Sequence, residues 1–420
     1  MAFEINPKDL IHPQNYGVGG QPHDLWTHLR ENAPVYRCEI EKYEPFWAIT
    51  KHSDIMDISS KPEIFSNAAG PVIMTDEQVA SRTGDESAAF NNMRTIIEMD
   101  PPEHRDFRKV ASGFFTPRSI HQLDEIVTEC AREQVDKLGD EGECDFVELI
   151  AQRHPLRVLA TLLGIEREDE EKVLELTQQL FAFDDPDLQR PGEDRNKAQA
   201  ELGLEFYNLF NAIIEDRRAT PREDLASLLA NAKMKNGEMM GPLETFGYYL
   251  IVFTAGHDTT RNAISGGMAA LLDNPAQLDL LCKNPDLAKS AVEEVVRWTS
   301  PVNYMRRKLL QDAEIRGVKI PKGDDLVLFY GSANRDSDVF DRPFDFDIER
   351  HPNRHLGFGT GEHFCLGAHV ARLSARALFL ELANRLESAE HGTSASTQID
   401  SSFVVGLKTL PMKYKIRPAA

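Results

Sequence analysis

Apolar side chains recur at helical spacing along the middle of the chain and at strand-like spacing near both ends. From residue 119 to 273 the spacing is largely helical, with breaks at 184–187 and 220–222 where proline meets charged residues. Residues 67–103 keep no sustained period, which predicts a long irregular loop of the kind that often carries function. Short strands are predicted at 35–39, 46–50, 315–320, 325–330 and 402–405.

The longest helix is predicted from about residue 243 to 274, roughly 32 residues and about 48 Å at 1.5 Å per residue. Its middle joins an apolar run to Gly256 and the polar residues His257, Asp258 and Thr259. A glycine inside a helix costs about 1 kcal/mol relative to alanine, and a buried acid is unfavourable unless it is hydrogen-bonded. Two unfavourable features at one place, here the glycine and the buried acid, are typical of a functional site. The alternative is a packing glycine beside a solvated polar face.

A glycine-rich segment, residues 355–372, brings Cys365 to the start of a further helix. The unpaired amides and positive dipole end of a helix favour a thiolate over a thiol. Gly361 and Gly367 let the backbone approach a flat group closely. The segment therefore predicts a thiolate ligand site. A core-facing stripe follows on the helix, made of Leu366, Val370, Leu373, Ala377 and Leu380.

Composition and charge narrow the class of protein. The 420 residues carry 47 Lys+Arg against 68 Asp+Glu, a formal charge of −21. This balance argues against a nucleic acid partner, because neutralising phosphates needs a basic surface. The start of the chain has no secretory pattern, and no stretch approaches the ~18 apolar residues of a spanning helix, so no membrane anchor is expected. The five widely spread cysteines favour reduced thiols in a cytoplasm over a disulfide scaffold or a zinc ribbon.

The spacing of Phe358, Gly361, His363, Cys365 and Gly367 resembles the haem-ligand signature of the cytochrome P450 monooxygenases. The resemblance implies a mainly α fold with small β-sheets, the cytochrome P450 fold, in which residues 1–420 form a single haem-binding monooxygenase domain. Three further segments match the family in the same order along the chain, namely His104 with Arg108, residues 255–259, and Glu294 with Arg297.

The resemblance also implies roles around the cofactor, which would be haem b, an iron protoporphyrin IX. Cys365 is expected to be the axial thiolate and so the metal ligand. Thr259 and Asp258 are expected to deliver protons to bound dioxygen, with Asp258 reaching solvent. The other implied cofactor contacts are His104, Arg108, Arg307 and His363 at the haem carboxylates, with Arg306 as the alternative to Arg307, Ala255 and Gly256 beside dioxygen, and Phe358 and Gly367 beside the ligand.

The expected reaction inserts one oxygen atom from O2 into a hydrophobic small molecule of sterol, terpene or alkyl-chain type. Apolar lining is the usual character of ligand pockets, and the segments that the resemblance assigns to substrate are mainly apolar. These substrate contacts are implied at Ile251, Ala255, Val302, Asn303 and Val404, and more broadly within 67–103, 181–183 and 403–405.

Electrons are expected from outside the chain, supplied by a ferredoxin and a ferredoxin reductase, because the haem domain accounts for the whole length. A small acidic ferredoxin needs a local basic patch on a chain of this net charge. Arg105, Lys109, Arg372 and Arg376 are expected to form that patch near the thiolate side.

Some points stay open at the level of sequence. The family often completes the Glu294 and Arg297 pair with an arginine where this chain has Asp345, so Arg335 and Arg350 are the candidates. A haem-thiolate ligand-binding or sensor protein is one alternative function, although it has no need of the proton delivery that Asp258 and Thr259 suggest. A peroxide-driven peroxygenase is another. A metal-dependent hydrolase with His257 and Asp258 as ligands is a further alternative, but no second His/Asp pair in the sequence supports it.

Overall fold

Helices form most of this computed structural model, which describes residues 4–417 apart from 83–93, 113, 115, 116, 182–184 and 189–194. The α-helices are α1 (Pro13–Gly19), α2 (His23–Asn32), α3 (His52–Ser59), α4 (Asp76–Arg82), α6 (Glu103–Ser112), α7 (Pro117–Val135), α8 (Arg153–Leu163), α9 (Glu170–Phe181), α10 (Arg195–Ala219), α11 (Leu225–Ala230), α12 (Pro242–Asp273), α13 (Pro275–Lys283), α14 (Ala288–Thr299), α15 (Tyr330–Ala333) and α16 (Ala368–Arg385). Short helical turns are η1 (Pro7–Leu10), η3 (Ile96–Glu98), η4 (Val147–Ala151), η5 (Arg167–Asp169), η6 (Pro186–Leu188), η7 (Pro285–Leu287) and η8 (Gly361–His363).

The strands form four small sheets. The largest has the order β1-β2-β8-β5-β3, in which β2 and β8 run parallel and the other neighbours run antiparallel. The others are β4-β12-β9, β10-β11 and the hairpin β6-β7. The strands are β1 (Val35–Cys38), β2 (Phe46–Ile49), β3 (Phe65–Ser66), β4 (Glu141–Asp145), β5 (Tyr304–Leu309), β6 (Ala313–Ile315), β7 (Val318–Ile320), β8 (Asp325–Phe329), β9 (Leu386–His391), β10 (Thr397–Gln398), β11 (Leu407–Thr409) and β12 (Pro411–Ile416).

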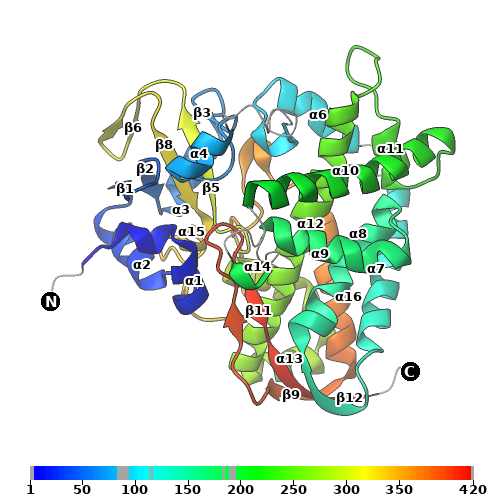
Figure 1. Cartoon of the computed structure of the whole chain (residues 1–420). Coiled ribbons are helices and arrows are strands. Elements are labelled where there is room, and N and C mark those ends of the chain that lie inside the picture. The colour runs from blue at the N-terminus through cyan, green and yellow to red at the C-terminus, as the bar shows by residue number, and fades with distance from the viewer. Residues whose placement is uncertain are drawn as a thin grey trace.

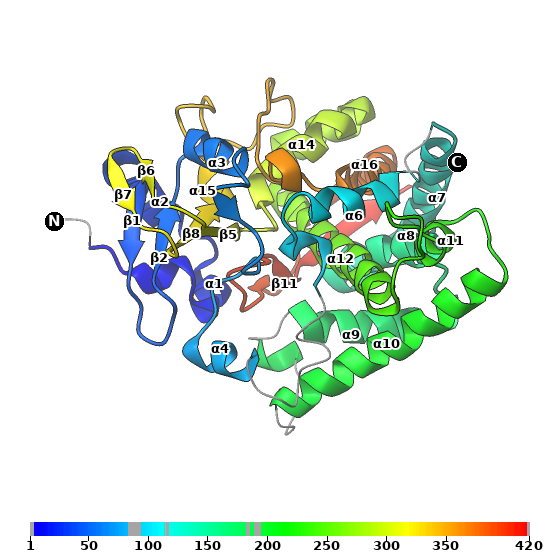
Figure 2. The same ribbon diagram turned by 90° about the horizontal axis from the view of Figure 1, so that it is seen from above.

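The large sheet and most of the helices occupy different sides of the molecule. Figure 1 shows β1, β2, β8 and β5 with the N-terminal helices on one side, and α7, α8, α10 and α16 on the other. Helix α12 packs against α8, α10, α14 and α16 and contributes side chains to two apolar clusters, so it joins the halves of the helical part. In Figure 2 it lies between α6 on one side and α9 and α10 on the other.

Most of the predicted elements are confirmed. Helix α12 begins at Pro242 and ends at Asp273, one residue from each predicted end, and proline in its first turn suits a helix start. Helix α10 ends at Ala219, directly before the predicted break at 220–222. The predicted strands at 35–39, 46–50 and 325–330 correspond to β1, β2 and β8, whereas the predicted strand at 315–320 is wrong, because it spans the turn of the hairpin β6-β7.

Local structure differs from the prediction at two further places. The segment 67–103 contains α4, whose start is stabilised by Thr75 and Gln78, each donating its backbone amide to the side chain of the other. The region 119–273 is largely helical as predicted, and the acidic strand β4 interrupts it by pairing with β12. Residues 402–405 form no strand; Val404 makes a single bridge to Val302. The predicted break at 184–187 lies partly outside the described residues.

None of the described helices combines the length and the apolar character needed to cross a membrane.

Candidate active site

The middle of α12 presents a small exposed residue. Ala255 is exposed although Phe253 and Thr254 before it are buried, so this turn of the helix faces accessible space rather than another element. The Thr259 hydroxyl lies one turn further along and donates to the carbonyl of Ala255 at 2.7 Å. A hydroxyl bonded only to the backbone of its own helix is able to rotate toward a molecule in that space.

Gly256 has the packing role that the sequence raised as an alternative. A Cβ atom at this position would lie 3.1 Å from both terminal methyl carbons of Leu159 on α8. Interiors packed to crystal density leave little room for such an added atom. The glycine therefore lets α8 approach α12 closely, and its place beside dioxygen stays a prediction.

Asp258 lies in a buried polar cluster on the same helix. Its side chain is 4% exposed, with Arg261 Nη1 at 3.6 Å and His257 Nδ1 at 3.7 Å from its oxygens. Among the described residues, Asp258 Oδ2, His257 Nδ1 and Arg261 Nε have no hydrogen-bond partner. The expectation that Asp258 reaches solvent directly is wrong, because these buried neighbours surround it. Sequence reasoning missed Arg261, although its i, i+3 spacing from Asp258 is a recognised ion-pair signal on a helix.

The outer atoms of this polar cluster are held by the neighbouring backbone. Arg261 Nη2 donates to the carbonyl of Leu407 on β11 at 3.2 Å, and His257 Nε2 lies 2.9 Å from the carbonyl of Gln152. Because a carbonyl can only accept, His257 carries a proton on Nε2, and in the neutral ring Nδ1 presents a lone pair toward Asp258. Burial lowers the pKa of Arg261, although the charge of Asp258 opposes this effect.

The loop before α16 presents Cys365. The Cys365 amide donates to the carbonyl of Phe358 at 2.9 Å, which closes the loop. Gly361 has a φ of +71°, and a Cβ atom there would lie 2.3 Å from the carbonyl oxygen of Ser59, so glycine is required at this point. No atom of the described chain lies within 4 Å of a Cβ built on Gly367. That side of the loop is therefore accessible to a flat group.

Two opposing effects act on the Cys365 thiol. Burial raises its pKa, whereas the amides of Gly367 and Ala368 and the charges of Arg108 and Arg372 lower it. Helix α16 begins at Ala368, three residues after the cysteine, so the amides at its start favour the thiolate, as the sequence predicts. A metal cation bound to the sulfur would stabilise the thiolate further.

Four basic side chains form an anion-binding set beside this loop. The rings of His104 on α6 and His363 on η8 lie 4.0 Å apart, and His104 Nδ1 and His363 Nε2 are buried without a partner among the described residues. The pKa of His363 is lowered to about 3, first by burial and then by the charges of His104, Arg307 and Arg108. In the part of the chain that is described, Arg108 and Arg307 form no ion pair with a carboxylate. The set therefore suits an anion that this chain does not itself supply.

The choice between Arg306 and Arg307 follows from their other partners. Arg306 donates to both oxygens of Asp325 at 2.8 and 3.0 Å and lies 3.1 Å from Glu44, so its charge is used within the sheet. Arg307 donates to the carbonyl of Arg306 at 2.7 Å and bonds to the hydroxyl of Tyr330. The preference for Arg307 at the anion-binding set is consistent with this geometry.

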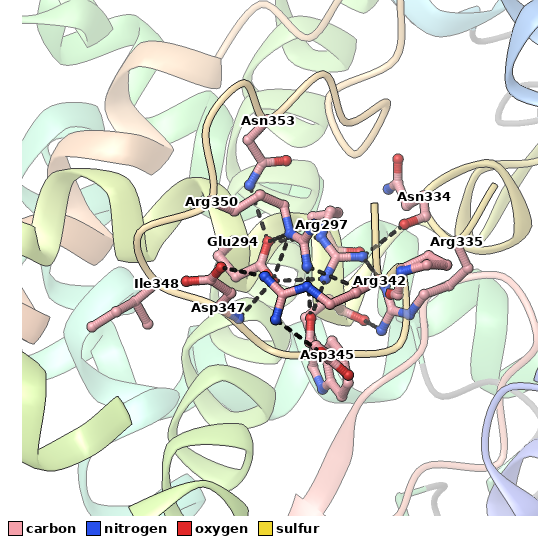
Figure 3. A network of polar contacts seen from close by, with 12 residues as sticks. Glu294, Arg297, Asn334, Arg335, Arg342, Asp345, Asp347, Ile348, Arg350 and Asn353 are labelled. Atoms are coloured by element: carbon pink, nitrogen blue, oxygen red, sulfur yellow. Dashed lines mark hydrogen bonds and ion pairs between the residues drawn. The ribbon is translucent and has the colours of Figure 1, made fainter. Parts of the chain in front are cut away.

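A second network surrounds Glu294 and Arg297, both of them fully buried. Arg297 donates to both oxygens of Glu294 at 2.6 and 2.7 Å (Figure 3). Arg350 Nε lies 3.2 Å from the Glu294 carboxylate, whereas Arg335 donates to the carbonyls of Arg297 and Trp298 instead. Of the two candidates, Arg350 therefore completes the network.

Comparison with known proteins supports the same architecture. A family model described as Cytochrome P450 matches residues 25–284 and 282–416. The chain is 39% identical to Cytochrome P450-terp of a Pseudomonas species, over 97% of this chain and 96% of that protein. The chain is a cytochrome P450. It is also 35% identical to linalool 8-monooxygenase of Pseudomonas putida, over 96% and 97% of the two chains.

A solved structure shares the fold of this cytochrome P450. The Mycobacterium marinum cytochrome P450 in complex with pseudoionone superposes with a TM-score of 0.86 at 31% identity, covering 98% of this chain and all of that one. The predicted family, fold class and monooxygenase activity are therefore confirmed. The family implies a haem cofactor. The residues present fit such a group: the orphaned nitrogens of His104 and His363 and the unpaired Arg108 suit its carboxylates, and the Gly367 backbone suits its face.

The predicted basic face of this P450 is largely neutralised. Arg105 donates to Glu362 at 3.1 Å, Arg376 donates to Asp124 at 2.8 Å, and Arg372 donates to Glu293 at 2.6 and 2.9 Å. The expected cluster of free cations is therefore wrong for these three arginines, because acidic neighbours from other elements pair with them. Lys109 is exposed at the same surface.

The predicted substrate residues differ in their surroundings. Ile251 and Val302 are half-buried, whereas Val404 is 4% exposed and bridges to Val302. Asn303 is fully buried, and its amide nitrogen donates to the Tyr16 hydroxyl at 3.0 Å and the Ser402 carbonyl at 2.8 Å. Asn303 therefore ties α1 to the C-terminal loop, and its contact with substrate stays a prediction. The side chains of 181–183 and part of the segment 67–103 lie outside the described residues.

Proposed function

We propose that residues 1–420 act as one haem b domain that takes electrons from a ferredoxin and hydroxylates a hydrophobic small molecule. The anion-binding set beside Cys365 carries this proposal. His104, Arg108, Arg307 and His363 come from three elements far apart in sequence, and among the described residues no carboxylate forms an ion pair with any of them. The charges of Glu362 and Asp100 act on His104 only through space. A cofactor with two carboxylates and an iron that takes a thiolate meets these requirements together.

Haem, when bound, supplies dioxygen binding and oxygen transfer. The chain's own contribution is to hold the cofactor and to move protons. Cys365 binds the iron, and the two imidazoles and two arginines bind the carboxylates. Thr259 can turn its hydroxyl from the Ala255 carbonyl toward the accessible side of α12. Asp258 Oδ2, which has no hydrogen-bond partner among the described residues, would accept a proton from a water molecule and give it to the Thr259 hydroxyl, which would release its own proton on the accessible side of α12.

The substrate we propose is a small, mainly apolar molecule of terpene type, with sterols and alkyl chains as the next classes. Ile251, Ala255 and Val302 offer hydrocarbon surface on the accessible side of the helix and of the sheet. Apolar surface with few polar groups binds hydrocarbon ligands through burial. The names of two similar proteins, one acting on linalool and one crystallised with pseudoionone, point to the same class.

A ferredoxin remains the proposed electron donor, but we expect it to dock through apolar contact and not through a basic patch. Phe364, directly before Cys365 in the chain, is 39% exposed, and two residues before it Glu362 pairs with the exposed Arg105 of α6. A face of paired charges around an exposed aromatic suits a partner held by apolar contact. The five cysteines are unpaired, and we place the protein in the cytoplasm on that account.

The experiment that tests the function begins with the absorption spectrum of the reduced protein under carbon monoxide. A strongly red-shifted carbonyl band would support Cys365 as a thiolate ligand, and a band of histidine or thiol type would overturn it. The oxidised protein is then titrated with linalool, pseudoionone, a steroid and a fatty acid. A shift toward high spin with linalool or pseudoionone and with neither of the others supports the terpene class. Turnover with peroxide, together with no turnover with a ferredoxin and its reductase, would overturn the proposal that a ferredoxin supplies the electrons.

A further inference from the structure

Phe358, in the loop that ends at Cys365, is held on one side by a cation. The guanidinium carbon of Arg372 lies 4.3 Å from the centre of the Phe358 ring. The carbonyl of the same phenylalanine accepts the amide of Cys365 at 2.9 Å. A cation at this distance over an aromatic face is attracted by the negative charge of the ring. The position of Arg372 is therefore coupled to Phe358, and through one hydrogen bond to Cys365.

Arg372 is itself fixed by Glu293 of α14. Its Nε and Nη2 atoms donate to the two carboxylate oxygens at 2.6 and 2.9 Å, which sets the plane of the guanidinium. The two side chains are 35% and 30% exposed, so solvent screens the pair only in part. This bidentate contact holds the guanidinium of Arg372 over the Phe358 ring.

A histidine completes this arrangement from the start of the loop. The Gly357 amide donates to His355 Nδ1 at 3.2 Å, so the proton of the neutral ring is on Nε2. That nitrogen lies 3.0 Å from Glu293 Oε2 and donates to it. Glu293 therefore connects the first residues of the loop with α16, which follows Cys365. We name Glu293 and Arg372 the proximal clamp.

We infer that the proximal clamp holds Phe358 and the charge of Arg372 against the loop that ends at Cys365 and so sets the reduction potential of the bound iron. The inference rests on the proposed assignment of Cys365 as the haem ligand. A fixed cation beside the thiolate stabilises the reduced, more negative state of the site. Glu293 and Arg372 act through Phe358 and Cys365, and are positioning residues.

The neighbouring Arg376 supplies a matched control. It lies one turn further along α16 and pairs with Asp124 at 2.8 Å, with side chains 39% and 54% exposed. It has the same charge and a similar exposure, but its guanidinium pairs away from the Phe358 ring. Loss of charge at Arg376 tests what a nearby surface cation does to the potential without the clamp.

The test measures the reduction potentials of wild type, Arg372→Gln, Glu293→Gln and Arg376→Gln by spectroelectrochemistry. We expect Arg372→Gln to shift the reduction equilibrium toward the oxidised form by on the order of tenfold, or about 59 mV for one electron. Glu293→Gln should shift it in the same direction by less, because the released Arg372 leaves the ring. Arg376→Gln should leave it unchanged.

The sign of the Glu293→Gln effect separates positioning from charge alone. Loss of a negative charge, with Arg372 still in place, would raise the potential, whereas loss of the clamp lowers it. A raised or unchanged potential in Glu293→Gln, or an equal shift in Arg372→Gln and Arg376→Gln, overturns the inference. If Arg372→Gln does not retain haem, the sign of the shift in reduction potential in Glu293→Gln still tests the inference. A wild-type protein without a thiolate carbonyl band instead overturns the proposed function, so the two failures are distinguishable.

Discussion

The buried charges on α14 and those on α12 are hydrogen-bonded to very different degrees. All five N–H donors of Arg297 and both oxygens of Glu294 are used within the fold. On α12, Asp258, His257 and Arg261 each keep a buried polar atom that has no partner among the described residues. Buried polar groups in folded proteins are normally paired. The difference teaches that the α14 network holds the structure together, whereas the α12 cluster keeps polar atoms for a ligand or a proton.

The largest effect is expected where the satisfied network is broken. In Glu294→Gln, the carboxylate that faces Arg297 and Arg350 loses its charge and leaves two guanidinium groups in a buried site without a counter-ion. We expect the free energy of unfolding to fall by about 3–5 kcal/mol. Urea unfolding at pH 7 measures this loss.

The matched control for this variant is Glu390→Gln. Glu390 lies 4.0 Å from Lys413 with both side chains exposed, so its loss should cost no more than about 1 kcal/mol. Equal unfolding free energies for the two variants would contradict the structural role of the α14 network.

A substitution in the α12 cluster of Asp258, His257 and Arg261 should lower activity more than stability. In Asp258→Asn the proton-accepting oxygen beside His257 is lost, so we expect product formation to fall by about 10² or more. The free energy of unfolding should fall by less than in Glu294→Gln, because Asp258 Oδ2 makes no hydrogen bond among the described residues and only its charge, 3.6 Å from the buried Arg261, is lost. Steady-state turnover and urea unfolding, measured on the same preparation, test both parts.

Asp273→Asn is the control on the same helix. Asp273 ends α12 and pairs with His391 in an exposed site, so turnover should not change. A stability loss in Asp258→Asn as large as that of Glu294→Gln would erase the contrast between the two regions.

The parts of the site that local patterns reveal are those that lie close together in the sequence. The Cys365 loop, the ends of α12 and the pair Glu294 and Arg297 all follow from spacings of a few residues. These features needed no knowledge of what packs against them. The preference for Arg307 over Arg306 is different, because the ion pairs of Arg306 with Asp325 and Glu44 become visible only in the fold.

What the sequence does not contain is which distant acid meets which base. Arg372 finds Glu293 across 79 positions, and Arg350 finds Glu294 across 56. On a chain with more acids than bases, each of the three arginines of the predicted basic face meets a carboxylate on another element, so that face is largely neutralised. The partner of Asp258 within its helix, Arg261, was likewise missed, although a buried acid at this place was expected.

Glu293 is less buried than the α14 network but, unlike the α12 cluster, its carboxylate is hydrogen-bonded. Its substitution should change the free energy of unfolding least. Glu293 is 30% exposed but bonded to Arg372 and His355. Burial alone would raise the pKa of Glu293, yet the hydrogen bonds from His355 and Arg372 lower it to about 2. The folded state therefore binds this proton more weakly than the unfolded chain, so the pair stabilises the protein above about pH 4.5 and loses that contribution as pH falls toward 2.

We expect Glu293→Gln to lower the free energy of unfolding by about 1 kcal/mol at pH 7, a value reduced by solvent screening. The difference from wild type should shrink steadily between pH 5 and about pH 3 as the wild-type carboxyl in the unfolded chain becomes protonated. Urea unfolding of both proteins across this range gives the curve, and Glu390→Gln, which removes an exposed glutamate, is the control. A difference that is constant with pH, or that grows on acidification, would mean that Glu293 is not held as a carboxylate by Arg372. Glu293 would then resemble Asp258, whose carboxylate has an unpaired oxygen, and not Glu294, whose carboxylate is held by two arginines.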